Sequence, residues 1–191
     1  MMKAWLGVGQ VTVGCWAIVQ VLISSGCGGE TEHDSKGSSS PADIAEQCLI
    51  AHNQVRAEVT PPANYPGTWS ALPNMVWSET VAASAQVWAD YLKDPARNCA
   101  LSHDSSSPYG ENVAGGFVGF SPTMAVQAWA KEKPNFVFNP SYQFDNSWGH
   151  YSQLVWRAST ELGCAMAFCS GTNVVVCRYN PPGNVLGDQP Y

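Results

Sequence analysis

The spacing of apolar residues changes near residue 134, and this change most constrains the fold. Before it, apolar residues recur at helical spacing in three segments: 44–59, 78–94 and 121–133. A proline or a pair of prolines follows each segment, and proline cannot continue a helix. The first two thirds of the chain therefore predict three α-helices.

After residue 134 the pattern changes to alternation and to runs of β-branched residues. Three segments have this character: 153–157, 163–169 and 173–179. Gly171 lies between the last two, where a hairpin would turn. Helices followed by antiparallel strands predict an α+β domain, an α-β-α sandwich with an antiparallel sheet between helices.

Residues 1–27 have the layout of an export signal, with one lysine, an apolar run and small residues at the end. The ending Ser25-Gly26-Cys27 is typical of a lipoprotein signal, which would leave a lipidated Cys27 as the first mature residue. An ordinary cleaved signal and an uncleaved membrane anchor are the alternatives. All three predict a protein that is secreted or anchored to the outside of the cell envelope.

Residues 28–42 are small and polar and predict a flexible linker, because they cannot bury enough apolar surface to fold. The folded domain is expected at residues 43–191, a length that suits one core. The net charge of −6 and a pI near 5.0 argue against a nucleic-acid partner. The chain is therefore expected to be one exported domain on a tether.

Five of the seven cysteines lie in the expected domain. In an exported protein they indicate disulfides rather than metal ligands. Spacing alone does not choose the pairing, although residues 169–177 look like a hairpin that a disulfide closes across its turn. Cys48 lies in the first helical segment and is the candidate for the unpaired thiol.

Four polar residues are candidates for a functional site: His103, Glu111, Glu132 and His150. His103 follows the second helical segment, and Glu111 lies in a glycine-flanked turn. Glu132 is expected on the third helix, and His150 just before the strand at 153–157. Two neutral imidazoles can bind zinc, and nearby carboxylates can orient the rings or hold a water.

Each of the four also has a structural explanation, such as a histidine bonded to a backbone carbonyl or a glutamate that caps a helix. His52, on the inner stripe of the first helical segment, is interpreted as such a core histidine. The chain has neither H-E-x-x-H nor G-x-S-x-G. The residues alone leave a metal site, a coupled acid–base site and a structural network open.

Six stretches in order carry a resemblance to a known family. They are AHNQVRAEV, AASAQVWADYL, NCALSHD, YGENVAGG, GHYSQLVWRAS (149–159) and VVVCRYNPPGNV (174–185). Together they resemble the CAP superfamily of cysteine-rich secretory proteins, antigen 5 and plant pathogenesis-related proteins. The resemblance covers nearly the whole expected domain.

The resemblance implies an α-β-α sandwich with a surface cleft. It also implies that His103, Glu111, Glu132 and His150 form the tetrad of that cleft. The two histidines would be ligands of zinc or another divalent cation, with the glutamates close by. Asp104 stands where many relatives have serine, and it is expected to make the cleft more acidic.

The resemblance also implies the disulfides Cys99–Cys164 and Cys169–Cys177. A third family disulfide has no counterpart here, because neither of its two cysteines is present.

Three functional hypotheses follow. The first is a non-enzymatic extracellular binding module, whose cleft holds a divalent metal and which binds a lipid or sterol, in part through residues 121–136. The second is a metal-assisted hydrolase of the protease kind, with Glu111 or Glu132 as the catalytic base. The third is an envelope interaction protein in which the tetrad only stabilises the fold. Membrane contact, if any, is expected through the N-terminus.

Overall fold

The computed structural model describes residues 39–139, 142–169 and 171–191, which belong to the unit Gly37–Tyr191. The elements follow in the order α1 (Pro41–Ala57), β1 (Val76–Trp77), α2 (Glu79–Lys93), β2 (Gly110–Gly116), α3 (Pro122–Ala130), the 3₁₀ helix η1 (Lys133–Asn135), α4 (Gly149–Leu154), β3 (Glu161–Cys169) and β4 (Thr172–Asn180). The predicted α+β class is confirmed.

The four strands form one sheet in the order β1-β3-β4-β2. Strands β3 and β4 are the expected hairpin, and β2 pairs antiparallel with the other edge of β4. The short strand β1 pairs parallel with β3, so the sheet is mixed rather than wholly antiparallel. Gly171 takes a φ of 81° at the hairpin turn, a conformation that favours glycine.

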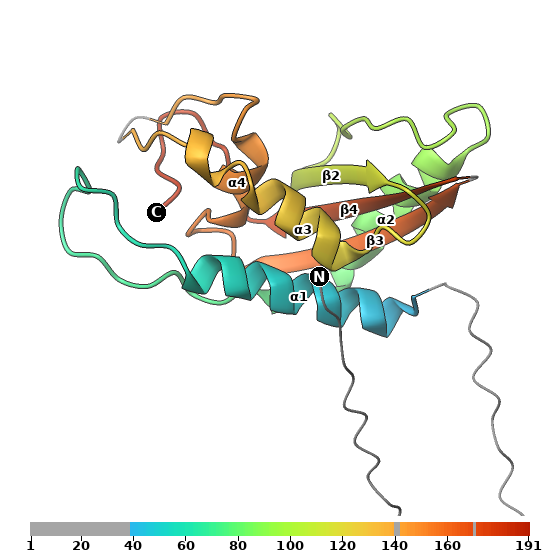
Figure 1. The fold of residues 1–191 in the computed structure, drawn as a ribbon, viewed down its shortest axis with the longest axis horizontal. Coiled ribbons are helices and arrows are strands. Elements are labelled where there is room, and N and C mark those ends of the chain that lie inside the picture. Colours follow the sequence, from blue (N-terminus) through green and yellow to red (C-terminus); the bar gives the residue numbers. More distant parts are fainter. Residues whose placement is uncertain (1–38, 140–141, 170) are drawn as a thin grey trace, which may run out of the picture. The chain divides into compact units, whose positions relative to one another are not determined.

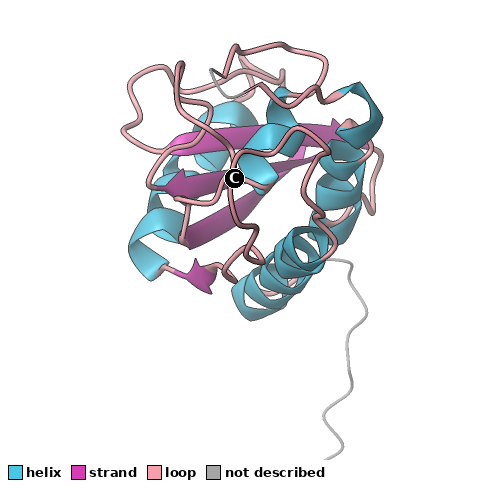
Figure 2. Ribbon diagram, turned by 90° about the vertical axis from the view of Figure 1, so that its left-hand side faces the viewer, coloured by secondary structure: helices cyan, strands magenta, loops and turns pink. Residues whose placement is uncertain are grey.

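Helices cover both faces of this sheet (Figures 1 and 2). One face packs against α1, α3 and α4 through residues that include Leu162, Cys164, Met166, Val175, Cys177 and Tyr179. The alternate residues of the hairpin pack against α2 and include Ala165, Ala167, Val174 and Val176. This alternation is the period-two pattern of a strand buried on both faces, and it confirms the expected sandwich.

Helices α1 and α3 differ slightly from their predicted bounds. Helix α1 begins at Pro41, inside the expected linker 28–42, because Ser40 and Asp43 form a capping box there. Helix α3 ends at Ala130, so Glu132 lies just beyond the helix rather than on it. Glu132 contacts the first turn of the neighbouring helix α4.

The predicted strand at 153–157 is wrong, because residues 149–154 form helix α4. Nearly all of this helix is buried, and a short buried apolar run does not reveal its period. His150 therefore lies in the first turn of a helix, not at the mouth of a strand. The glycine-rich turn expected at Glu111 is instead strand β2, which the pairing with β4 stabilises.

The disulfide pairing inferred from the family resemblance is also wrong. The structure has Cys99–Cys169 and Cys164–Cys177, so all four expected cysteines are bonded but with exchanged partners. The register of the hairpin explains the exchange: Cys177 lies opposite Cys164, whereas Cys169 lies opposite Thr172. Cys48 is the free and buried thiol, as predicted.

The expected export signal 1–27, with Cys27, lies outside the described residues. Within the described residues, no helix has both the length and the hydropathy of a membrane span.

Candidate functional site

His103 and Glu111 form the first half of the site. His103 lies in the loop after α2, and Glu111 is the second residue of β2. The Nδ1 of His103 is 2.9 Å from Oε1 of Glu111, which also accepts the backbone N–H of Asp104 at 3.1 Å. The glutamate side chain is only 6% exposed, whereas that of His103 is 61% exposed. A buried carboxylate thus holds an exposed imidazole.

Arg178, on the neighbouring strand β4, neutralises the Glu111 carboxylate. It faces Glu111 in the register of β2 and β4, and its guanidinium reaches Oε2 of Glu111 and Oδ2 of Asp104. It also donates to the hydroxyl of Ser84 on α2. Asp104 is therefore paired, and the expected extra acidity of the cleft is offset by a buried cation.

His150 and Glu132 form the second half. The Nδ1 of His150 is 2.6 Å from Oε1 of Glu132. The other oxygen, Oε2, accepts the backbone N–H groups of His150 and Tyr151 at 3.0 and 3.1 Å. Glu132 thereby binds amides of the first turn of α4, which have no partners within that helix. The ring of Trp129 stacks near that of His150, with the centroids 6.1 Å apart.

Both imidazoles therefore have the same tautomer. A carboxylate accepts, so each Nδ1 carries the hydrogen and each Nε2 of a neutral ring keeps its lone pair. Neither Nε2 has a hydrogen-bond partner within the described part of the chain.

His103, Glu111 and His150 line one cavity of about 90 Å³. Asn112, Phe144, Asn146, Gly149 and Asn184 complete its lining, while Glu132 stands behind His150. The structure thus brings three tetrad members to one cavity and connects the fourth to it.

Hydrogen bonds around the cavity shift two pKa values. The hydrogen bond to Glu111 raises the pKa of His103, against the opposing effect of burial. Hydrogen bonding to Ser106, and then to Arg178, lowers the pKa of Asp104. The first half of the site therefore favours a protonated His103 as the pH falls.

The tetrad does not offer three close ligand atoms. Among the described residues, the group of three whose ligand atoms lie within 4.8 Å of one another is Cys48, Cys164 and Cys177, and two of these share a disulfide. In the tetrad both glutamates are committed to imidazole Nδ1 atoms. The free ligand atoms are thus the two Nε2 nitrogens, and the carboxylates orient the rings.

Residues 49–179 match the family model of CAP, the cysteine-rich secretory protein family. The chain belongs to this family.

Individual relatives agree with that assignment. Pathogenesis-related protein 1 of Arabidopsis thaliana is 38% identical over 158 residues, which cover 82% of this chain and 86% of that protein. The basic form of pathogenesis-related protein 1 of Nicotiana tabacum is 33% identical over 180 residues, covering 94% and 86%. The crystal structure of the hookworm platelet inhibitor has a TM-score of 0.61 at 28% identity and covers 78% of this chain and 75% of that one.

Arg178 and Asn112 also belong to the site in this CAP domain, although the sequence did not single them out. Arg178 sits inside the apolar run VVVCRYN, and an arginine in such a run indicates a buried partner carboxylate. In the structure Arg178 is 3% exposed. Asn112 is 1% exposed and donates to the carbonyl of His150 at 3.1 Å. No local signal distinguishes Asn112, because its partner is 38 residues away.

His52 is the core histidine that the sequence predicted. It is fully buried, and its Nδ1 donates to the carbonyl of Cys48 at 2.6 Å. The hydroxyl of Tyr179 donates to its Nε2 at 2.9 Å. Burial lowers the pKa of His52 to about 4, so this ring is neutral and has no free nitrogen.

Proposed function

We propose that this CAP protein is an exported, non-enzymatic binding protein whose cleft holds a divalent cation between His103 and His150. One observation carries the proposal: the Nδ1–H of each imidazole donates to a glutamate, while both rings line the same cavity. Glutamates that fix histidine rings in this way are the usual second layer of a metal site.

Zinc suits this donor set best, because it prefers imidazole nitrogen over an all-oxygen site. Two protein ligands leave the remaining positions to water or to a bound partner. Such a site favours exchangeable binding rather than a permanent structural metal. Two disulfides and the similarity to pathogenesis-related proteins support an extracellular, defence-type setting for it.

The contacts of both glutamates argue against the hydrolase hypothesis. A catalytic base needs a carboxylate that can take a proton from water. Glu111 is held by His103, Arg178 and a backbone amide, and Glu132 by His150 and two backbone amides. Both oxygens of Glu111 are filled, whereas Oε1 of Glu132 accepts one bond, from the imidazole that it orients, and keeps one acceptor position.

Calorimetric titration of ZnCl₂ into the full chain tests the metal proposal. We expect about one ion per chain at pH 7.5, and weaker binding at pH 5.5 because protons compete for the imidazoles. The His103→Ala/His150→Ala variant should lose the site, whereas His33→Ala, which changes a histidine of the expected linker 28–42, should bind like the wild type. Equal titrations for the wild type and the double variant would reject the cleft as a metal site.

A second candidate function is lipid or sterol binding in the groove between α1 and α3. This groove has a volume of about 370 Å³ and includes Ala51, Val55, Val126 and Ala130, with Lys131 beside them. The lysine suits the carboxylate of a fatty acid, although Glu58 also lines the groove and would repel a carboxylate placed next to it.

A variant that fills the groove separates this function from the metal site. Ala130→Phe should abolish binding of a fluorescent fatty acid, while Ala128→Phe, on the exposed side of α3, should leave binding intact. The His103→Ala/His150→Ala variant should bind the fatty acid normally. If Ala130→Phe binds as well as the wild type, the groove is not the lipid site.

A further inference from the structure

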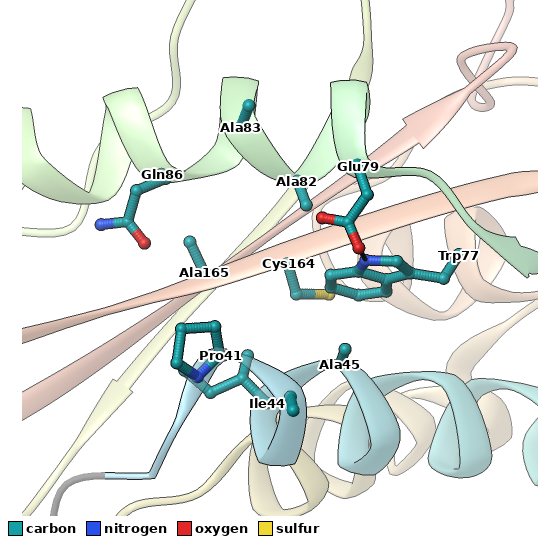
Figure 3. A pocket seen from close by; sticks show the side chains of 11 residues that line it. Pro41, Ile44, Ala45, Trp77, Glu79, Ala82, Ala83, Gln86, Cys164 and Ala165 are labelled. Carbon is teal, nitrogen blue, oxygen red and sulfur yellow. Dashed lines mark hydrogen bonds between the residues drawn. The ribbon is translucent and has the colours of Figure 1, made fainter.

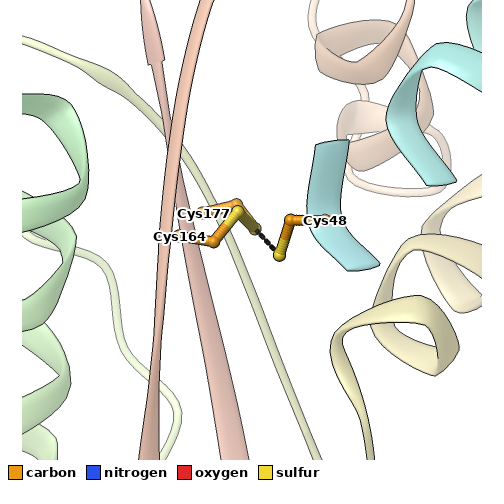
Figure 4. Close-up of side chains that lie close together, drawn as sticks. All are labelled: Cys48, Cys164 and Cys177. Carbon is orange, nitrogen blue, oxygen red and sulfur yellow. Dashed lines mark hydrogen bonds between the residues drawn. A yellow bond between two sulfur atoms is a disulfide. The ribbon is translucent and has the colours of Figure 1, made fainter. Parts of the chain in front are cut away.

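The free thiol of Cys48 lies against a disulfide in the core. Its Sγ is 3.9 Å from Sγ of Cys177, and the three sulfurs of Cys48, Cys164 and Cys177 lie within 4.8 Å of one another (Figure 4). They come from α1, β3 and β4, so the tertiary structure alone brings them together. Cys48 and Cys177 are fully buried.

The third sulfur faces a cavity. A pocket of about 420 Å³ lies between α1 and α2, and Cys164 forms part of its lining (Figure 3). Most of the other lining side chains are apolar, and Glu79 is the charged one. Glu79 accepts a hydrogen bond from the indole N–H of Trp77 at 3.0 Å, which holds it beside the pocket. Cys164 is 4% exposed and lines the pocket, whereas Cys48 and Cys177 have no exposed surface and do not line it, so only the Cys164 end of the disulfide meets the pocket.

We propose that Cys48 exchanges with the Cys164–Cys177 disulfide and that the released Cys164 thiol is a covalent modification site in this pocket. The thiolate of Cys48 attacks Sγ of Cys177, and a Cys48–Cys177 bond forms as the Cys164–Cys177 bond breaks. The electron pair leaves on Sγ of Cys164, which takes up the proton that Cys48 gave up. The exchange conserves electrons and needs no external oxidant or reductant.

A small disulfide entering the pocket would then trap the product. The Cys164 thiolate attacks one sulfur of the reagent, a mixed disulfide forms on Cys164, and the other half leaves as a free thiol. The carboxylate of Glu79 favours a cationic reagent over an anionic one. This site is separate from the His103/His150 cleft and does not depend on a metal there.

Burial makes the exchange slow. It raises the pKa of Cys48, so the attacking thiolate is rare at neutral pH. The titratable groups that interact with Cys48 are His52 and Tyr179, and the charged group next to them is Arg56; between pH 7 and 9 the first two stay neutral and the third stays cationic. The rate of the exchange should therefore rise with pH, because the fraction of Cys48 present as thiolate rises.

Incubation of the full chain with cystamine at pH 9, followed by acid quenching and non-reducing peptide mapping, tests the proposal. We expect an aminoethylthiol adduct on Cys164 together with a Cys48–Cys177 cross-link. Cys48→Ala should lose both products, since this variant has no free thiol next to the disulfide. An adduct on Cys48 itself, or an unmodified Cys164–Cys177 bond after prolonged incubation, would overturn the proposal.

Two further experiments use the same non-reducing peptide mapping. The anionic 3,3′-dithiodipropionate should modify Cys164 less than cystamine does, and Glu79→Gln should remove that difference. Equal yields on the wild type would contradict the assigned charge preference. Cys164→Ser should fold with a Cys48–Cys177 disulfide, and free thiols on both Cys48 and Cys177 in that folded variant would show that the two sulfurs cannot bond.

Discussion

Glu111 and Arg178 stand opposite each other on β2 and β4, and Oε2 of the glutamate accepts from Nε and Nη2 of the arginine at 3.2 and 3.1 Å. Both side chains are almost fully buried. The other oxygen of Glu111 holds His103 at the cavity. The buried guanidinium of Arg178 thus positions the exposed imidazole of His103 through Glu111.

Removal of Arg178 should destabilise the fold strongly. Arg178→Met leaves the buried Glu111 carboxylate without its cation, which typically costs about 3–5 kcal/mol. Urea unfolding should show a lower midpoint with an unchanged slope. Arg97→Met, which removes an exposed arginine lying over the ring of Tyr91, should cost about 1 kcal/mol or less. Equal losses for the two variants would contradict the role given to the buried pair.

Glu132→Gln should weaken the site through His150. The amide can present only one oxygen, so either the His150 imidazole or the two backbone N–H groups lose their acceptor, at a cost of about 1–3 kcal/mol. If the cleft binds zinc, the affinity should fall about 10- to 100-fold. Thermal unfolding and calorimetry measure the two effects, with the exposed Glu46→Gln as control. Unchanged stability and affinity would mean that Glu132 does not position His150.

His52 should make the protein less stable as the pH falls. Its pKa drops from an ordinary 6.5 to about 4 because the folded protein buries it without a charge partner. Below pH 6.5 the unfolded chain therefore binds a proton that the folded state does not, so stability falls as pH falls from 6.5 toward 4. The full loss is about 3 kcal/mol.

The pKa of His103 is raised, so its contribution has the opposite sign: it is present below pH 6.5 and lost as pH rises through the folded value. Its side chain is largely exposed, so His52 should dominate between pH 6.5 and 5. Urea unfolding over that range should show a shallower pH dependence for His52→Gln than for wild type. A steeper dependence in this variant would assign the acid sensitivity to another group.

The two disulfides should differ in their contribution to stability. The Cys99–Cys169 disulfide joins residues 70 positions apart, and the Cys164–Cys177 disulfide closes a shorter loop, with a separation of 13. The chain-entropy relation gives about 4.4 kcal/mol for the first and about 2.9 kcal/mol for the second. Denaturant unfolding of the two double-alanine variants measures the difference. The reverse order, or cross-links Cys99–Cys164 and Cys169–Cys177 on peptide mapping, would contradict the structure.

Local signals in the sequence predicted three helices, the β3–β4 hairpin and the unpaired Cys48. Capping serines, prolines and the alternation of strand residues act over a few neighbours, so they can be read from the chain. The family resemblance brought His103, Glu111, Glu132 and His150 together as a set, and the structure places three of them around one cavity with Glu132 behind His150.

Tertiary structure alone decided the rest. Residues 149–154 form a helix whose residues other than His150 are buried in the core, and Glu111 is in a strand because β4 pairs with it. The register of the hairpin, not cysteine spacing, set the disulfide partners. Arg178 meets Glu111 across 67 positions of sequence. Such contacts depend on which surfaces remain to be buried once the helices and strands exist, and no short stretch of the chain carries that information.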